Sequence, residues 1–219
     1  KTKRNARQSF QIVQNTTVDF DEKKVYIPKF KDGIKCRFHR FFDGKIKTST
    51  ISRTSTDRYY ISILVEMDDN NPEKKPIDES KAVGIDLGIK TFATLSNGKE
   101  IPNPRNLKNA IAKLKRLQRR LSKKAKASNN REKARRVLAC QYERVTNRRN
   151  DFLEKVTHHL VTTYDTICLE TLSASNMMKN HRLAQALSDI AIGRFNQLIE
   201  QKAEWYGVNI LRIGRFEPS

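Results

Sequence analysis

Residues 82–90 of the sequence read AVGIDLGIK, an apolar run that holds one carboxylate, Asp86, between two glycines. Apolar residues alternate with Gly84, Asp86 and Gly88, and a period of two predicts a β-strand with one packed face and Asp86 on the other. The glycines would let a backbone or a phosphate come close. The stretch therefore predicts either a site carboxylate or a buried, hydrogen-bonded aspartate in an ordinary sheet.

The residues after this run predict further strands, one of which ends in a second acid. Residues 91–95, TFATL, are typical of a second strand. Residues 96–99, SNGK, predict a tight turn, because Asn-Gly tolerates the positive φ angles of hairpin turns. Residues 166–170, TICLE, predict an apolar strand that ends in Glu170. If neighbouring strands bring Asp86 and Glu170 together, the pair could hold Mg²⁺ in a phosphodiesterase site.

The composition indicates a polyanionic partner. The 219 residues include 44 lysines and arginines against 24 acids, a formal charge of +20. Charge on this scale favours nucleic acid over membrane as the partner. No apolar run approaches the roughly 20 residues of a membrane span, and the start, KTKR, does not resemble a secretory signal. Three scattered cysteines suit a reducing compartment. We therefore expect a soluble, cytoplasmic, nucleoid-associated protein without a membrane partner.

Much of this charge lies in residues 105–160, which predict a helical hairpin and are called the basic hairpin below. Apolar residues recur every three or four positions before and after a break at 126–130. From Arg105 to Lys155 there are 18 lysines and arginines against 4 acids. A solvated face is one interpretation, but this imbalance favours a phosphate-facing surface. The residues predicted to contact nucleic acid are Lys113, Arg116, Arg120, Lys123, Lys124, Arg135, Arg148 and Arg149.

Residues 1–80 are rich in predicted strands. The strongest patterns lie at 9–13, 24–27 and 59–65, and turns are predicted at Asp32-Gly33 and Asp43-Gly44. Short strands with basic residues between them favour a small barrel or curled sheet that can hold oligonucleotides, or simply a β-domain with a charged surface. Residues 68–76, with two prolines, predict a linker. Helical and strand patterns return near the end of the chain, at residues after Ser173, from Asp189 and at 208–213.

Several motifs, in this order, resemble the TnpB family of transposon-encoded RNA-guided nucleases, which are related to compact type V CRISPR effectors. The matching stretches are the first RuvC motif at 84–90, the short motif at 103–104, the basic helix pattern at 147–155, the second RuvC motif at 169–172, and residues 176–180 and 203–207. The resemblance is dense from about residue 82 to 219. It is weaker over residues 1–80.

The resemblance implies an α+β fold. Residues 81–219 would form an RNase H-like (RuvC) nuclease domain with a mixed sheet and the inserted basic hairpin, and residues 1–80 part of a β-barrel, OB-like wedge domain. It implies guide RNA and target DNA as partners and a two-ion Mg²⁺ site. Asp86 would bridge both ions and Glu170 would hold one.

The family's third RuvC acid and its zinc ribbon would follow Pro218-Ser219. We therefore expect an RNA-guided DNA endonuclease as the full-length protein, with no cleavage by these 219 residues alone. The alternatives are an RNA-guided DNA-binding repressor that does not cleave, and a basic RNA-binding accessory protein with a decayed site.

Overall fold

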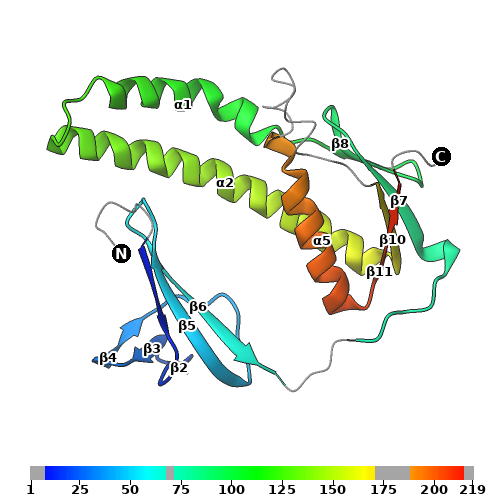
Figure 1. The fold of residues 1–219 in the computed structure, drawn as a ribbon, viewed down its shortest axis with the longest axis horizontal. Helices are drawn as coiled ribbons and strands as arrows, with labels where there is room; N and C mark the ends of the chain where they lie inside the picture. The colour runs from blue at the N-terminus through cyan, green and yellow to red at the C-terminus, as the bar shows by residue number, and fades with distance from the viewer. Residues whose placement is uncertain (1–7, 68–71, 171–187, 215–219) are drawn as a thin grey trace. The chain divides into compact units, whose positions relative to one another are not determined.

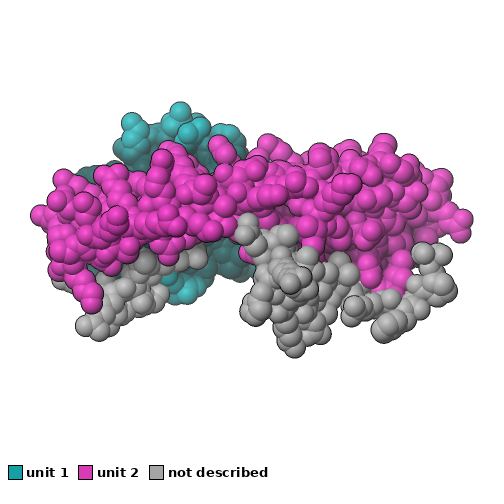
Figure 2. Space-filling view, turned by 90° about the horizontal axis from the view of Figure 1, so that it is seen from above, with its two compact units in different colours: residues 1–70 teal, residues 71–219 magenta. Residues whose placement is uncertain are grey.

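The computed structural model describes residues 8–67, 72–170 and 188–214. The chain divides into two compact units, residues 1–70 and 71–219, shown in separate colours in Figure 2. The division falls within the segment predicted to be a linker, before the expected domain start at residue 81. Each unit is described by itself.

The first unit contains two three-stranded antiparallel sheets (Figure 1). One has the order β1-β5-β6, formed by β1 (Gln8–Ile12), β5 (Lys45–Arg53) and β6 (Tyr59–Glu66). The other has the order β2-β3-β4, formed by β2 (Thr17–Asp19), β3 (Lys24–Ile27) and β4 (Phe30–Lys35). The three strands with strong patterns are thus present. The long strand β5 was missed, because its sequence KIKTSTISR is largely polar. A closed barrel stays a prediction.

The turn predicted at Asp32-Gly33 is wrong, because both residues lie within β4. Gly33 has a φ of +72°, and the pairing of β3 with β4 shifts register between Val25 and Ile27. A bulge accommodates such a residue without ending the strand. An Asn-Gly or Asp-Gly pair indicates a residue with positive φ, and such a residue occurs in bulges as well as in turns.

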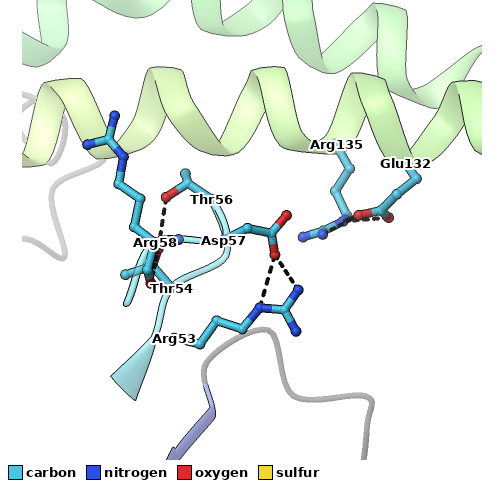
Figure 3. Close-up of polar contacts among 7 residues, drawn as sticks. All are labelled: Arg53, Thr54, Thr56, Asp57, Arg58, Glu132 and Arg135. Carbon is cyan, nitrogen blue, oxygen red and sulfur yellow. Dashed lines mark hydrogen bonds and ion pairs between the residues drawn. The ribbon is translucent and has the colours of Figure 1, made fainter. Parts of the chain in front are cut away.

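The connection between β5 and β6 is stabilised by hydrogen bonds among its own residues (Figure 3). Both Nε and Nη2 of Arg53 donate to Oδ1 of Asp57. The hydroxyls of Thr54 and Thr56 lie 2.8 Å apart, and the backbone N–H of Arg58 donates to Oγ1 of Thr54 at 3.2 Å. Asp57 has a φ of +63°, a conformation that aspartate tolerates better than most residues. These local bonds fix the register of the hairpin.

The second unit contains a five-stranded mixed sheet of order β11-β10-β7-β8-β9. Its strands are β7 (Ala82–Leu87), β8 (Thr91–Leu95), β9 (Glu100–Pro102), β10 (Thr166–Glu170) and β11 (Asn209–Ile213). The neighbours β7, β10 and β11 run parallel, whereas β8 and β9 continue from β7 as an antiparallel meander. The strands expected around the two acids are confirmed. The fold class is therefore mixed α/β.

Three α-helices are described in this unit: α1 (Asn106–Ser122), α2 (Asn129–Thr163) and α5 (Ile192–Tyr206). The short 3₁₀ helix η1 (Glu79–Lys81) precedes β7. Figure 1 shows α1 running back along α2, which confirms the helical hairpin. The pattern predicted after Ser173 lies in part outside the described residues. Among the described helices, none is both long and apolar enough to cross a membrane.

Two apolar clusters hold this unit together. A small one, built on Leu114, Leu138 and Val145, lies between α1 and α2. The larger one joins the sheet to α5 and the C-terminal part of α2, and its fully buried side chains include Phe92 and Phe195. The amphipathic stripe of each helix thus has its own partner. The sheet and its two acids rest on the larger cluster, whereas the basic hairpin extends from it.

A buried lysine fastens α5 to α2. The Lys202 ammonium donates to the backbone O of Glu154 at 2.8 Å and to Oγ1 of Thr157 at 3.0 Å. It also forms an ion pair with Oε2 of Glu154 at 2.7 Å. A buried charge is tolerated when its donors are satisfied in this way. The helices that cover the sheet are therefore held by specific polar contacts as well as by apolar packing.

Candidate functional site

Asp86 lies near the end of β7, on the less covered face of the sheet. Val83 and Ile85 are buried while Asp86 is exposed, as the alternation of the sequence predicted. Within the described residues, the Asp86 carboxylate has no hydrogen-bond or ion-pair partner. The interpretation as a buried, hydrogen-bonded aspartate is therefore wrong, because the side chain is exposed and no described donor holds it.

The two glycines beside Asp86 differ in their structural roles. An ideal Cβ on Gly88 would lie 2.9 Å from the backbone O of Thr91, and the Gly88 N–H donates to the backbone O of Phe92 at 3.1 Å. Glycine is required there by the tight return into β8. A Cβ on Gly84 would meet only ordinary contacts, the nearest being 3.6 Å to Cβ of Ser96. The expected close approach of a backbone is therefore present at Gly88, whereas a close approach of a phosphate to Gly84 stays a prediction.

Glu170 ends β10, the parallel neighbour of β7. The register pairs Leu169 with Ile85, and both of these side chains are buried. Asp86 directly follows Ile85 and Glu170 directly follows Leu169, so continuing the register by one residue places the two acids opposite each other. Because side chains alternate between faces, both acids lie on the same face of the sheet. The parallel register thus brings together the two acids that the sequence separates by the whole basic hairpin.

The donor set suits a hard cation. Two carboxylates at matching positions repel each other, and no described cationic side chain pairs with either. Mg²⁺ is commonly held by one or two carboxylates together with water and phosphate oxygens. Among the described residues, no group of three His, Cys, Asp or Glu side chains could hold a metal. The pair therefore fits part of a Mg²⁺ site, and its role as metal ligands stays a prediction.

The predicted nucleic-acid contacts on α1 form one stripe. Lys113, Arg116 and Arg120 are spaced by three and four residues, all are exposed, and Lys123 follows at the same spacing. On a helix of 3.6 residues per turn, this spacing places them along one flank of the apolar stripe. Lys124 is half-buried just after the helix. Within the described part of the chain, no carboxylate pairs with any of these five.

The predicted contacts on α2 are less uniform. The guanidinium of Arg135 is hydrogen-bonded to both carboxylate oxygens of Glu132, and Figure 3 shows this pair. Nη1 of Arg149 donates to the backbone O of Ser188 at 2.8 Å. Arg148 is exposed. Two of the three arginines therefore use part of their hydrogen-bonding capacity within the chain.

Asp189 is a positioning residue that the sequence pattern did not reveal. Only 8% of it is exposed. Its carboxylate accepts the backbone N–H of Leu107 at 2.8 Å and that of Lys108 at 3.1 Å. These are orphan donors of the first turn of α1, whose N-cap residue Arg105 makes no side-chain cap bond. The negative charge of a carboxylate there also interacts favourably with the positive end of the helix dipole. No local sequence signal marks a cap supplied from so far along the chain.

The Asn103-Pro104 motif shapes the loop that leads into α1. Nδ2 of Asn103 donates to the backbone O of Ile89 at 2.9 Å, and its Oδ1 accepts the backbone N–H of Arg105 at 2.9 Å. The loop borders a pocket of about 530 Å³. Neither catalytic candidate lines this pocket. In this structure the motif orders the path from the sheet to the basic hairpin.

Comparison with known proteins places these elements in a family. Residues 62–181 match the model of OrfB_IS605, described as a probable transposase. A protein of Streptomyces pristinaespiralis named "Putative RNA-guided DNA endonuclease" is 41% identical over 172 residues, which are 78% of this chain and 42% of that protein. InsQ of Escherichia coli, with the same description in its name, is 33% identical over 81% of this chain and 43% of its own length.

Two further similarities are more distant. The TnpB-like protein L79 of Acanthamoeba polyphaga mimivirus is 26% identical over 78% of this chain and 35% of its own length. A solved chain from the cryo-EM structure of the Cas12f1-sgRNA-target DNA complex superposes with a TM-score of 0.49 and 16% identity, over 78% of this chain and 36% of that one. The chain spans about two fifths of the length of the bacterial relatives. Because the family model matches more than half of its residues, the chain belongs to the OrfB_IS605 family, the TnpB family that its motifs resemble.

Proposed function

We propose that the protein to which this chain belongs is an RNA-guided DNA endonuclease of a transposon, which cleaves target DNA by metal-dependent phosphodiester hydrolysis. The observation that carries the proposal is the position of Asp86 and Glu170, each one residue beyond the paired Ile85 and Leu169 on adjacent parallel strands. Family membership supports it, as do the relatives named RNA-guided DNA endonucleases. Guide RNA and target DNA are the proposed partners.

The sheet suits this role because of its order and directions. Three parallel strands flanked by an antiparallel meander are what we expect of an RNase H-like, RuvC-type domain. In such a domain the acids come from neighbouring strand ends. Asp86 and Glu170 would together hold Mg²⁺, which supplies an activated water and stabilises the leaving oxygen. The chain's own contribution is to fix both carboxylates on strands anchored by the larger apolar cluster.

The basic hairpin would bind the phosphate backbone. Its stripe on α1 lacks carboxylate partners among the described residues, so its charge is available to phosphates. Phosphate contacts position a nucleic acid without reading its sequence. Sequence recognition would then come from pairing with the guide RNA, and the first unit, as part of a wedge domain, would contribute to gripping guide RNA and duplex. The cleaving protein would thus combine a metal site and a phosphate channel in one unit.

The proposal is tested with the full-length protein, its guide RNA and a labelled matched DNA. We expect cleavage when Mg²⁺ is present and none when the ion is chelated, while binding of the matched DNA persists in both conditions. Guide-dependent binding without cleavage at any Mg²⁺ concentration would instead favour an RNA-guided repressor. Binding that needs no guide would favour a basic RNA-binding accessory protein. Cleavage that persists after thorough chelation would overturn the metal-dependent mechanism.

A further inference from the structure

The free end of the basic hairpin contains a pocket that the proposed function does not require. It has a volume of about 210 Å³ and lies between the end of α1 and the start of α2. We propose that this pocket binds one unpaired nucleotide of a single-stranded RNA or DNA segment, with the base on its apolar floor and the phosphates on its basic rim. This inference rests on the proposed function, because it assumes that nucleic acid reaches the hairpin.

The floor of the pocket is apolar and well anchored. The name floor is used here for the apolar lining residues Leu117, Ala134 and Val137. Leu117 also packs on the cluster of Leu114 and Leu138 that joins the two helices, so the floor is continuous with that small core. Val137 is 51% exposed, so its side chain is accessible to a ligand. The small side chain of Ala134 leaves space between the larger side chains of Leu117 and Val137, and this space is part of the pocket.

The rim of the pocket is basic. Arg120, Lys124 and Lys133 line it, with Asn130 as a further polar group, and no carboxylate is among the lining residues. Within the described residues, none of the three cations has a carboxylate partner, and the acid at the start of α2, Glu132, pairs with Arg135. Three cations around an apolar floor favour an anionic ligand that also has an apolar surface.

The turn that shapes the pocket is held by hydrogen bonds. Nη1 of Arg131 donates to the backbone O of Leu121 at 3.1 Å and to that of Lys124 at 3.0 Å. The backbone N–H of Arg131 donates in turn to Oγ of Ser128, the N-cap of α2. Arg131, in the first turn of α2, thus ties the end of α1 to the start of α2. The backbone beside the pocket is therefore held in place, which lowers the entropic cost of binding.

An unpaired nucleotide matches these features better than a duplex. Duplex phosphates need only the rim, because paired bases are stacked away from an apolar floor. An unpaired base exposes its ring faces and is commonly buried against side chains, while its phosphates follow a positive groove. The volume is below the roughly 300–1,000 Å³ of pockets for drug-sized ligands, so it suits one ring system. An acidic, apolar peptide is the competing occupant.

The test measures how strongly the full-length protein prefers bases over a bare backbone. The probes are a ten-nucleotide uridine RNA, a thymidine DNA of the same length, and a fully abasic strand. Ala134→Leu fills the floor without changing charge, and Ala112→Leu on the exposed surface of α1 is its matched control. We expect Ala134→Leu to reduce the preference for at least one base-bearing probe about threefold or more, with abasic binding and the control unchanged. If only the uridine RNA loses affinity, the bound nucleotide comes from RNA; if only the thymidine DNA does, it comes from DNA.

If Ala134→Leu keeps the parent's preference for base-bearing probes over the abasic strand, the proposed nucleotide pocket is rejected. If that variant does not fold, Val137→Ser removes apolar contact at an exposed position and must show the same selective loss. Lys133→Gln separates this inference from the proposed function: it should lower the affinity for all three probes. Loss in Lys133→Gln with no selective effect in the floor variants would leave phosphate binding by the hairpin intact and reject the pocket. Loss of affinity for an acidic peptide alone would assign the pocket to a protein partner and also reject the proposal.

Discussion

Asp86 and Glu170 lie at matching positions on adjacent parallel strands, each one residue beyond the buried pair Ile85 and Leu169. The parallel register is what makes them neighbours, since the basic hairpin separates them along the chain. Their shared face follows from the alternation of each strand. Two carboxylates held side by side without a described cation are more stable when a cation binds between them.

Replacing either acid should therefore abolish cleavage and spare binding. In the full-length protein with guide RNA, we expect Asp86→Ala and Glu170→Ala to lower the cleavage rate about a hundredfold or more, because each loss disrupts the metal geometry. Affinity for matched DNA, measured by gel shift, should remain, because phosphate contacts lie elsewhere. Glu79→Ala, on η1, is the control and should cleave as the parent does. A normal rate in either site variant would remove that acid from the site.

The basic stripe of α1 should control the salt dependence of binding. A triple variant, Lys113/Arg116/Arg120→Ala, should reduce the slope of log affinity against log salt by about three units, because each phosphate contact releases roughly one counterion.

The matched control for this triple variant is Lys108/Lys115/Arg119→Ala. It removes the same charge from the other flank of the apolar stripe of α1, given the helical period. Its slope should stay close to that of the parent. Equal slopes for both triple variants would show that the stripe is a solvated face and that only net charge matters.

The fold was predictable wherever local periodicity was strong. The alternation around Asp86 and the apolar spacing in the basic hairpin gave strands and helices close to those observed. Strand β5 was missed because polar β-branched residues, rather than apolar alternation, form it. The glycine of β4 was misread because positive φ serves both bulges and turns.

The candidate site was only partly predictable. The sequence identified Asp86 and Glu170 but could not supply the register that brings them together. It also gave no sign of long-range contacts such as those of Asp189 with the start of α1, or of Lys202 with α2. Such contacts depend on tertiary packing. Charge counts predicted a basic surface but not which arginines, such as Arg135, already have partners within the chain.

Asp189 should stabilise the start of the basic hairpin. We expect Asp189→Ala to lower the free energy of unfolding by about 1–2 kcal/mol, since two N–H groups of α1 lose their acceptor. Asp189→Asn, which retains one acceptor oxygen, should lose less. Urea denaturation measures both. Asp151→Ala removes only an exposed ion pair with Lys155 and should change stability by less than about 1 kcal/mol. An equal effect of Asp151→Ala and Asp189→Ala would contradict a capping role.

Gly207 and Gly193 form a matched pair for a test of backbone constraint. Gly207 has a φ of +64°, and a Cβ on it would lie 2.5 Å from the backbone O of Glu73. Gly207→Ala should therefore destabilise the chain by roughly 1–2 kcal/mol or more. A Cβ on Gly193, in the first turn of α5, would have no neighbour within 4 Å among the described residues, so Gly193→Ala should be neutral or stabilise by up to about 1 kcal/mol. Thermal unfolding of the two variants should shift in different directions or by clearly different amounts.

Asp165 should make stability fall in acid. A hydrogen bond from the Lys75 ammonium, at 2.6 Å, together with Lys81, holds the pKa of the Asp165 carboxyl below its ordinary value of 3.8. Because the folded pKa is depressed, the carboxylate stabilises the fold above pH 3.8, and this contribution is lost as the pH falls through the lower folded-state value. Urea denaturation across a pH series spanning 3.8 should show a shallower acid loss in Asp165→Asn than in the parent. The control Glu79→Gln removes an exposed acid outside this network and should follow the parent curve. Parallel curves for Asp165→Asn and the parent would show that this ion-pair cluster does not couple folding to proton binding.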